Sequence, residues 1–403
     1  MAMNRRYFLR STVVTLLLAS TSSAYARSAS SEWDDSFDTG PLAGNKVVSY
    51  SPVLSSNTVA HTTQAIAQLE PLVAAGGWPV VPTSQGALKI GMQNPAVSIL
   101  RQRLAISGDL AKSAGMSPAF DTYVDAAVRR FQTRHGLPAD GAVGDATYAA
   151  LNVSAADRLK QLQMNVQRLD TSARMTDHEK RFVMVNIPAA QIEAVENGSV
   201  VQRHTAVVGK IDRQTPILDS KISQIILNPY WTVPKSIIRK DIIPLMQRNP
   251  SYLTDNKIHL YRPNGQEIQP SEVNWTTDEA VGLMFRQDPG KGNAMSSTKI
   301  NFANSHAVYM HDTPQQTLFN SLMRFDSSGC IRVQNIRDLN QWILKNTPGW
   351  NREHIEEVIN SRINTPIGVS DPVPLHFVYI SAWSNDDGVI QFRDDIYKMD
   401  GLS

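Results

Sequence analysis

The sequence predicts a multidomain α+β protein, in which a small three-helix domain precedes a mainly β domain with an inserted segment. Three observations predict this fold class. A chain of 403 residues, at about 150 residues per domain, suggests two to three domains. Apolar residues recur at three- and four-residue intervals between Pro95 and Leu151, as on helices. After Arg181 the spacing changes to the alternation of strands, and Asn197-Gly198 is a strong hairpin signal.

The composition supports packed domains and narrows the class of partner. Hydrophobic residues make up 42% of the chain and charged residues 19%. The net charge of +2 comes from 39 basic and 37 acidic residues, and the first 26 residues hold three of the arginines and no acid. The body is therefore close to neutral, which argues against nucleic acid as a partner. One cysteine excludes an internal disulfide and a multi-cysteine zinc site.

The first 26 residues have the features of an export signal. Paired arginines, Arg5-Arg6, precede the apolar run Val13–Ala19, and Ala24-Tyr25-Ala26 offers small residues for cleavage. Arg-Arg-x-Phe-Leu-Arg resembles the bacterial twin-arginine signal, so we expect a signal peptide over residues 1–26. The run is shorter than the ~20 residues that span a bilayer; a retained anchor is the alternative. We expect an exported protein in the periplasm or envelope of a bacterium, without a stable membrane span.

Residues 27–93 are rich in Ser, Thr, Ala, Pro and Gly, and we assign this region no function of its own. The stretches 27–31 and 76–79 are typical of a tether or loop. Ile66, Leu69 and Leu72 have helical spacing and predict one helix over Thr63–Ala75.

Residues 95–151 form a compact helical unit. Val97, Leu100 and Leu104 line one face of the first helix, and the second helix ends at His135-Gly136. The stretches that resemble the peptidoglycan-binding type 1 domain are Ala127–Gln132, Gly136–Gly144, Thr147 and Leu151. The resemblance implies a cell-wall partner, although such a domain can also be a packing module that no longer binds glycan.

The rest of the chain divides into a helix and a β domain. We expect a connecting helix within residues 155–180, a mainly β domain over 181–360 and an extension over 361–403 that packs on it. Strands are expected at Thr205–Val208, Ile222–Leu227 and Ala307–His311. The pattern is lost at about 229–281, which is too long for a plain loop and predicts an insertion.

Cys330 is the first candidate for chemistry. It follows Ser327-Ser328-Gly329, a flexible turn that allows close approach of a ligand, and Arg332 could favour its thiolate. The alternative is a small buried hydrophobic residue, which free cysteine often is.

A thiolate nucleophile needs a base, and His311 has the best context among the nine histidines. It ends an expected strand, and Asp312-Thr313-Pro314 must then leave the sheet. Strand alternation places Tyr309 and His311 on one face. Taken alone, such a histidine is more often structural than catalytic.

The motifs around both residues resemble those of YkuD-type L,D-transpeptidases. They are His311-Asp312-Thr313-Pro314, Leu318-Phe319, Arg324 and Ser327–Val333. Asp-Thr-Pro after the histidine resembles the larger branch, whose catalytic domain carries an inserted lid. In many shorter members a glycine follows the histidine, so the sequence leaves open which group orients the ring.

The resemblance implies a reaction and roles for the site residues. Cys330 would be the nucleophile and His311 the proton acceptor, then donor. The thiolate would attack the bond between the third-position diamino acid of a peptidoglycan tetrapeptide stem and its terminal D-alanine. The resulting thioester would be resolved by the amine of a second stem. We expect the N–H of Cys330, with Gly329 or Ser328, to bind the oxyanion.

Other roles at this site are less defined by the resemblance. Arg332 could bind a substrate carboxylate, hold the loop or tune the thiol, and Tyr309 could contact the donor stem or only pack. Trp231 and Trp275 would give the lid an apolar surface that excludes water from the site.

Several alternatives stay open at this point. Ser296–Lys299 fits Ser-x-x-Lys, but Lys-Thr-Gly and Ser-Asp-Asn are absent. A zinc amidase lacks support because there is no His-Glu-x-x-His, and we expect neither metal nor cofactor. An L,D-carboxypeptidase or D-amino-acid exchange would use the same acyl-enzyme, and a non-catalytic wall-binding protein is the rival from another class. We expect a monomer that acts in cell wall biogenesis and cell shape.

Overall fold

The computed structural model describes residues 48–84 and 86–401. The expected signal peptide over 1–26 lies outside the described residues, as does the tether-like stretch 27–31. The N-terminal half is helical. Its helices are α1 (Ser56–Ala74), α2 (Pro95–Ile106), α3 (Thr122–Arg134), α4 (Asp145–Leu151) and α5 (Ala155–Thr176), with a short 3₁₀ turn at Lys112–Ala114.

Side-chain caps fix where these helices begin. The Asn94 side chain accepts from the Ala96 N–H at 2.9 Å, and Pro95 occupies the first helical position, where its missing N–H costs nothing. The Asp121 carboxylate caps α3 by accepting from the Val124 N–H at 3.1 Å. Ser55 caps α1 in the same way, so this helix begins seven residues before the expected Thr63. Helices α2, α3 and α4 pack around one apolar core, as the sequence pattern predicts.

The second half is built on a nine-stranded sheet. Its order is β11-β3-β12-β10-β9-β4-β13-β1-β2, and β3 also pairs with β2, so that the sheet closes on itself. The strands of this sheet are β1 (Arg181–Asn186), β2 (Gln191–Glu196), β3 (Ser199–Gly209), β4 (Leu218–Leu227), β9 (Thr298–Phe302), β10 (Met310–His311), β11 (Phe325–Ser327), β12 (Ile331–Val333) and β13 (Thr365–Val378).

The position of β13 differs from the sequence-based expectation. Residues 361–403 were expected to form an extension that packs on the β domain. Instead β13 is antiparallel to β4 and parallel to β1, and lies between them in the sheet. Val373, Leu375 and Phe377 on this strand are buried in the main core. The β domain therefore does not end at residue 360.

The strand at β10 is shorter than expected. Only Met310–His311 pairs, whereas Ala307–His311 was predicted. The Asn304 side chain explains this, because its carbonyl oxygen accepts from the N–H groups of His306 and Val308 at 3.0 Å each. A side chain thus replaces the neighbouring strand until residue 309.

Two helices and a short hairpin complete this half. Helices α9 (Ile336–Leu344) and α10 (Arg352–Ser361) add Leu339, Ile343 and Ile355 to the main core of the sheet. The hairpin of β14 (Ala382–Ser384) and β15 (Ile390–Phe392) packs with α1 and α5. No helix within residues 48–84 and 86–401 is long and apolar enough to cross a membrane.

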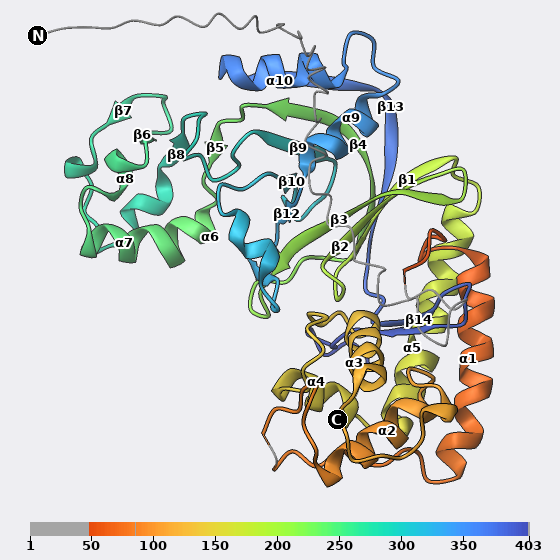
Figure 1. The fold of residues 1–403 in the computed structure, drawn as a ribbon. Coiled ribbons are helices and arrows are strands. Elements are labelled where there is room, and N and C mark those ends of the chain that lie inside the picture. Colours follow the sequence, from red (N-terminus) through yellow and green to blue (C-terminus); the bar gives the residue numbers. More distant parts are fainter. Residues whose placement is uncertain (1–47, 85, 402–403) are drawn as a thin grey trace, which may run out of the picture. The chain divides into compact units, whose positions relative to one another are not determined.

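The inserted segment has a core of its own. Strands β5 (Trp231–Thr232), β6 (Ile258–Tyr261), β7 (Glu267–Ile268) and β8 (Met284–Gln287) form a separate sheet. Around it lie α6 (Lys235–Ile237), a π-helical turn (Ile238–Ile242), α7 (Ile243–Arg248) and α8 (Tyr252–Asp255) (Figure 1). Since β8 pairs with both β5 and β6, the insertion extends beyond residue 281 to Gln287. We call residues 229–287 the lid.

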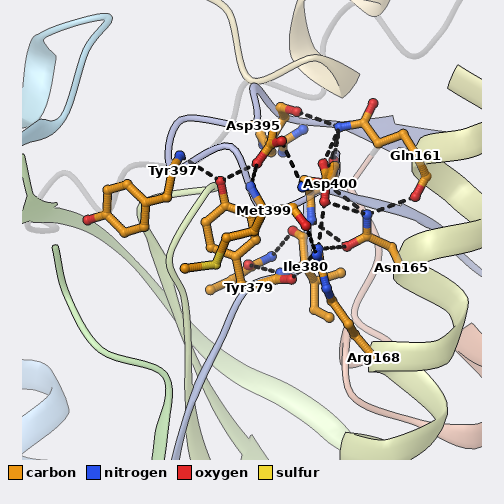
Figure 2. A network of polar contacts seen from close by, with 12 residues as sticks. Gln161, Asn165, Arg168, Tyr379, Ile380, Asp395, Tyr397, Met399 and Asp400 are labelled. Carbon is orange, nitrogen blue, oxygen red and sulfur yellow. Dashed lines mark hydrogen bonds and ion pairs between the residues drawn. The ribbon is translucent and has the colours of Figure 1, made fainter. Parts of the chain in front are cut away.

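A buried carboxylate attaches the last described residues to α5. Asp400 is fully buried and pairs with Arg168 at 2.6 Å, and it accepts from the Ser381 hydroxyl (Figure 2). Asn165 and Gln161 donate to the Ser381 hydroxyl from the same helix. Because breaking a buried ion pair leaves an uncompensated charge, this network fixes the segment after β15 on α5.

Candidate active site

The candidate residues lie on neighbouring strands of the main sheet. Strand β10 lies between β9 and β12, and His311 is the register partner of both Lys299 and Arg332. One position earlier, Met310 pairs with Ile300 and Ile331, and all three are fully buried in the main core. Because side chains alternate between faces, Lys299, His311 and Arg332 lie on the opposite face of these strands.

Cys330 enters this face immediately before β12. The Ile331 N–H donates to the Tyr309 carbonyl at 3.1 Å, which holds Cys330 beside Tyr309. The Cys330 side chain is half-buried, and the thiol receives hydrogen bonds from the Tyr309 backbone N–H and the Tyr309 hydroxyl. The Tyr309 ring lies edge-on to the His311 ring, with 5.5 Å between centroids. The structure thus brings Cys330, Tyr309 and His311 together.

Ser327 and Gly329 shape the turn before Cys330. The Ser327 hydroxyl donates to the Cys330 carbonyl at 2.5 Å and accepts from the Gly329 N–H at 3.1 Å. Gly329 has φ of +108°, which L side chains rarely adopt. The Gly329 N–H thus already donates to Ser327, whereas no group among the described residues accepts from the Cys330 N–H.

The group that orients His311 is its own neighbour. His311 Nδ1 lies 2.6 Å from the Asp312 carbonyl oxygen, which can only accept, so Nδ1 carries the proton. The lone pair is then on Nε2, the nitrogen that can act as a base. The Asp312 carboxylate in turn accepts from the hydroxyl of Ser297 at 2.6 Å and the N–H of Thr313 at 2.8 Å.

One cation, Lys299, and one indole, Trp231, lie next to Tyr309. The Lys299 ammonium lies 4.3 Å from the centre of the Tyr309 ring. Burial lowers the pKa of Lys299, and the nearby Cys330 opposes that shift. Trp231 of the lid donates to the Tyr309 hydroxyl, which itself donates to Cys330, so an indole, a phenol and a thiol form one chain.

Burial determines the protonation states of Cys330 and His311 at neutral pH. It lowers the pKa of His311 to about 4, against which the hydrogen bond to Asp312 acts only in part. Burial also raises the pKa of the Cys330 thiol, although Tyr309, Lys299 and Arg332 act in the opposite direction. The resting pair is therefore a neutral thiol and a neutral imidazole, and Arg332 favours the thiolate without overcoming burial.

Arg332 and Ser328 occupy different positions around the turn. Burial lowers the pKa of Arg332, and its Nη1 is buried with no hydrogen-bond partner among the described residues. Ser328 is exposed, and its hydroxyl accepts from Arg213 Nη1 at 2.8 Å. Arg213 also pairs with Asp241 of the lid at 2.8 Å, so one guanidinium connects the lid to the turn before Cys330.

The two lid tryptophans are not equivalent. Trp231 reaches Tyr309, as described above. Trp275 instead packs edge-on against Phe285 in the core of the lid, and its indole N–H donates to the Pro270 carbonyl at 2.9 Å. The expectation that Trp275 faces the site is not met, because the lid needs this side chain for its own core.

Sequence reasoning did not identify four residues of this site as functional: Ser297, Lys299, Arg213 and Asp241. The first two belong to the Ser-x-x-Lys match that was set aside as a chance occurrence, and that match was the available signal. Arg213 contacts both Asp241 and Ser328, which lie 28 and 115 residues away in the sequence, and no local pattern reveals such contacts. Within residues 48–84 and 86–401 no three His, Cys, Asp or Glu side chains gather as a metal site would require.

Iodoacetamide should alkylate Cys330 slowly at pH 7, and the rate should rise with pH to a midpoint above the ordinary thiol pKa of about 8.5. The reason is that burial keeps the thiol protonated. Tyr309→Phe removes the hydroxyl donor and should move the midpoint up by about one pH unit, since hydrogen bonds to charged groups contribute roughly 1.5 kcal/mol or more. A rate already at its plateau at pH 5 would instead indicate a thiolate–imidazolium pair.

The site thus combines a thiol, an imidazole with a fixed tautomer and a backbone N–H that has no acceptor among the described residues. The domain that holds these groups matches a known family. Residues 180–352 match the family model described as "L,D-transpeptidase catalytic domain", YkuD, and residues 93–151 match "Putative peptidoglycan binding domain". The chain therefore carries a YkuD-family L,D-transpeptidase catalytic domain, preceded by a peptidoglycan binding domain.

Similar individual proteins carry the same family name. A protein of Haemophilus influenzae named "Putative L,D-transpeptidase" is 31% identical over 242 residues, which cover 60% of this chain and 48% of that protein. The chain thus spans about half the length of this curated relative.

Two solved structures are also similar. The L,D-transpeptidase of Xylanimonas cellulosilytica (17% identity, TM-score 0.23) matches over 74% of this chain and 100% of its own. That of Stackebrandtia nassauensis (13% identity, TM-score 0.26) matches over 72% and 94%. At these TM-scores the two structures add nothing to the family assignment, which comes from the sequence match.

Proposed function

We propose that the protein is a peptidoglycan L,D-transpeptidase that cross-links third-position diamino acids through a thioester on Cys330, with release of D-alanine. The observation that carries the proposal is the joint placement of Cys330, Tyr309 and His311, with the proton of His311 fixed on Nδ1. The proposal includes export to the bacterial envelope and recognition of the wall by residues 95–151.

Acylation begins from the neutral pair. His311 Nε2 takes the thiol proton as Cys330 Sγ attacks the carbonyl that joins the diamino acid to the terminal D-alanine. The Cys330 N–H donates to the oxyanion that forms, and one such donor contributes about 3 kcal/mol to catalysis. The C–N bond then breaks, His311 returns the proton to the departing amine of D-alanine, and the stem remains as a thioester.

Deacylation reverses these roles. The side-chain amine of a second stem gives a proton to His311 as it attacks the thioester carbonyl, and the proton passes to the departing sulfur. Arg332 is suited to a substrate carboxylate or carbonyl, because its positive charge acts close to Cys330. Tyr309 and Lys299 stabilise charge that develops on sulfur.

The lid excludes water from the thioester until the amine arrives. Asp241→Asn should weaken the Arg213 connection between the lid and the Ser328 turn. A partly exposed ion pair contributes up to about 1 kcal/mol, so hydrolysis relative to cross-linking should rise at most about fivefold. The ratio of the two products, measured by mass spectrometry, checks this.

Asp278→Asn is the matched control for the lid. Asp278 pairs with Arg239 at 3.3 Å, both side chains are exposed, and the pair lies within the lid. The product ratio should not change in this variant. An equal ratio in the Asp241 and Asp278 variants would show that Arg213 does not hold the lid closed.

The proposed function is tested by identifying the reaction products by mass spectrometry. The protein is incubated with defined tetrapeptide-bearing wall fragments, and cross-linked dimers, free D-alanine and a covalent adduct on Cys330 are expected. A carbapenem should acylate the same sulfur. Tripeptide products alone would make the protein an L,D-carboxypeptidase, and exchanged termini would indicate transfer to D-amino acids.

A further inference from the structure

A cavity of about 280 Å³ is lined by none of the candidate active site residues. It is bounded by α1, by the peptidoglycan binding domain, by the start of α5 and by β15. Leu69, Trp78 and Phe392 contribute apolar surface to it. The volume is sufficient for a small ion together with several water molecules, each of which occupies about 30 Å³.

The charged residues that line this cavity are mostly positive. Four arginines line it, and each is at most 6% exposed; they are Arg103, Arg130, Arg134 and Arg158. Asp109 is the one carboxylate among the lining residues that the structure describes. His135 also lines the cavity, and burial together with the nearby arginines lowers its pKa well below the ordinary value, so it adds no charge at neutral pH.

The single carboxylate is already committed to one arginine. Asp109 accepts from Arg134 through both carboxylate oxygens, at 2.6 Å each, and from the Ser107 hydroxyl at 2.6 Å. A bidentate pair of this kind uses most of the acceptor capacity of the carboxylate. Among the hydrogen bonds of the described residues, Asp109 therefore accepts none from Arg103 or Arg158.

Arg103 and Arg158 have only neutral acceptors. Arg103 donates to the Leu151 carbonyl at 2.9 Å and Arg158 to the Gln161 side chain at 2.8 Å. Arg103 Nη1 and Arg158 Nε are buried, and neither has a hydrogen-bond partner among the described residues. A buried donor that is left unpaired on a charged group costs more than 1–3 kcal/mol. Both atoms are shielded from solvent, so an anion in the cavity would act on the positive charge of the two guanidinium groups and not on these two atoms.

The electrostatics of the two arginines agree with this geometry. Burial and repulsion from neighbouring arginines lower the pKa of Arg103 to about 9 and that of Arg158 to about 10. Asp394 and Asp157 favour the charged form of Arg158 from outside the cavity lining, but do not restore its ordinary pKa. Stacking on Trp78 (3.8 Å) and Phe392 (4.5 Å) covers guanidinium faces without supplying negative charge.

We propose that this arginine cavity, defined by Arg103, Arg130, Arg134 and Arg158, binds a small oxyanion through a phosphate or carboxylate group. Planar guanidinium groups recognise both chemistries. The site is independent of Cys330, so it goes beyond the proposed transpeptidase reaction. A bound anion would lie between α1, the peptidoglycan binding domain and β15, because residues of all three line the cavity.

The first test is calorimetric titration of the full chain at constant ionic strength. Inorganic phosphate is the probe in one arm and citrate the probe in the other, with chloride as the reference. Saturable one-to-one binding of either anion is expected, and the anion that binds identifies phosphate or carboxylate as the preferred group. Arg103→Gln should weaken binding at least tenfold, whereas the exposed Arg174→Gln should not change it. Absence of saturable binding in both arms would overturn the proposal.

A second variant keeps the test valid if Arg103→Gln does not fold. Gln68 is exposed on α1 and lines the cavity, so Gln68→Glu supplies a carboxylate from the protein itself. It should raise the melting temperature and weaken binding of the anion at least tenfold. Gln64→Glu, one turn earlier on α1 and outside the cavity lining, should do neither. Equal effects of the two substitutions would show that only surface charge had changed.

Discussion

Replacing Cys330 by alanine should abolish acyl-enzyme formation completely, while the protein stays folded and still binds cell wall. Cys330 is the single cysteine of the chain, so no other thiol can take its place. The side chain is half-buried, and loss of its sulfur should reduce the free energy of unfolding by about 1 kcal/mol. Intact-protein mass after incubation with tetrapeptide fragments measures acylation, and sedimentation with wall sacculi measures binding.

The Cys330→Ala experiment also separates two classes of function. Cys330→Ser should be as inactive as Cys330→Ala, because a serine hydroxyl is far less acidic than a thiol. Ile363→Ala, an exposed position between α10 and β13, serves as the active control. A covalent adduct in Cys330→Ala would place the nucleophile elsewhere. Wall binding without any adduct in the native protein would identify a non-catalytic wall-binding protein.

Replacing His311 by asparagine should reduce acylation by about 10²- to 10⁴-fold, the usual contribution of general base catalysis. Asparagine can still donate to the Asp312 carbonyl, so the local structure should be retained. With a neutral resting pair, alkylation of Cys330 by iodoacetamide above pH 9 should change little, because His311 does not set the charge of the thiol. In the native protein the acid limb of acylation should lie near pH 4, where His311 becomes protonated.

The control for His311 is another histidine close in sequence. His306→Asn changes an exposed residue five positions earlier and should leave acylation unchanged. A decrease of less than tenfold in His311→Asn would remove the general-base role. An acid limb near pH 6.5 would show that burial does not lower the pKa of His311 as the structure indicates.

The fold class and the family could be predicted because their signals are local. Helical spacing in residues 95–151 and alternation after Arg181 each lie within short windows, and both the α+β class and the two domain families are confirmed. The motif residues around Cys330 and His311 are also local, since β10 and β12 are close in sequence.

What could not be predicted depends on long-range pairing and on burial. Strand β13 pairs with β4 across about 140 residues, and no local pattern specifies such a partner. The contact of Arg213 with Ser328 spans 115 residues. The influence of Arg332 on the thiol was predicted with the correct sign, but its size relative to burial required the structure.

The position of β13 between β4 and β1 has a practical consequence for the design of shorter fragments of this protein. A fragment that stops where the family match ends, at residue 352, would lack the strand that separates β1 from β4. Both strands would then present unsatisfied backbone edges to solvent, and such edges recruit other chains. Aggregation of that fragment would report a missing strand, and would say nothing about whether the intact catalytic half is soluble.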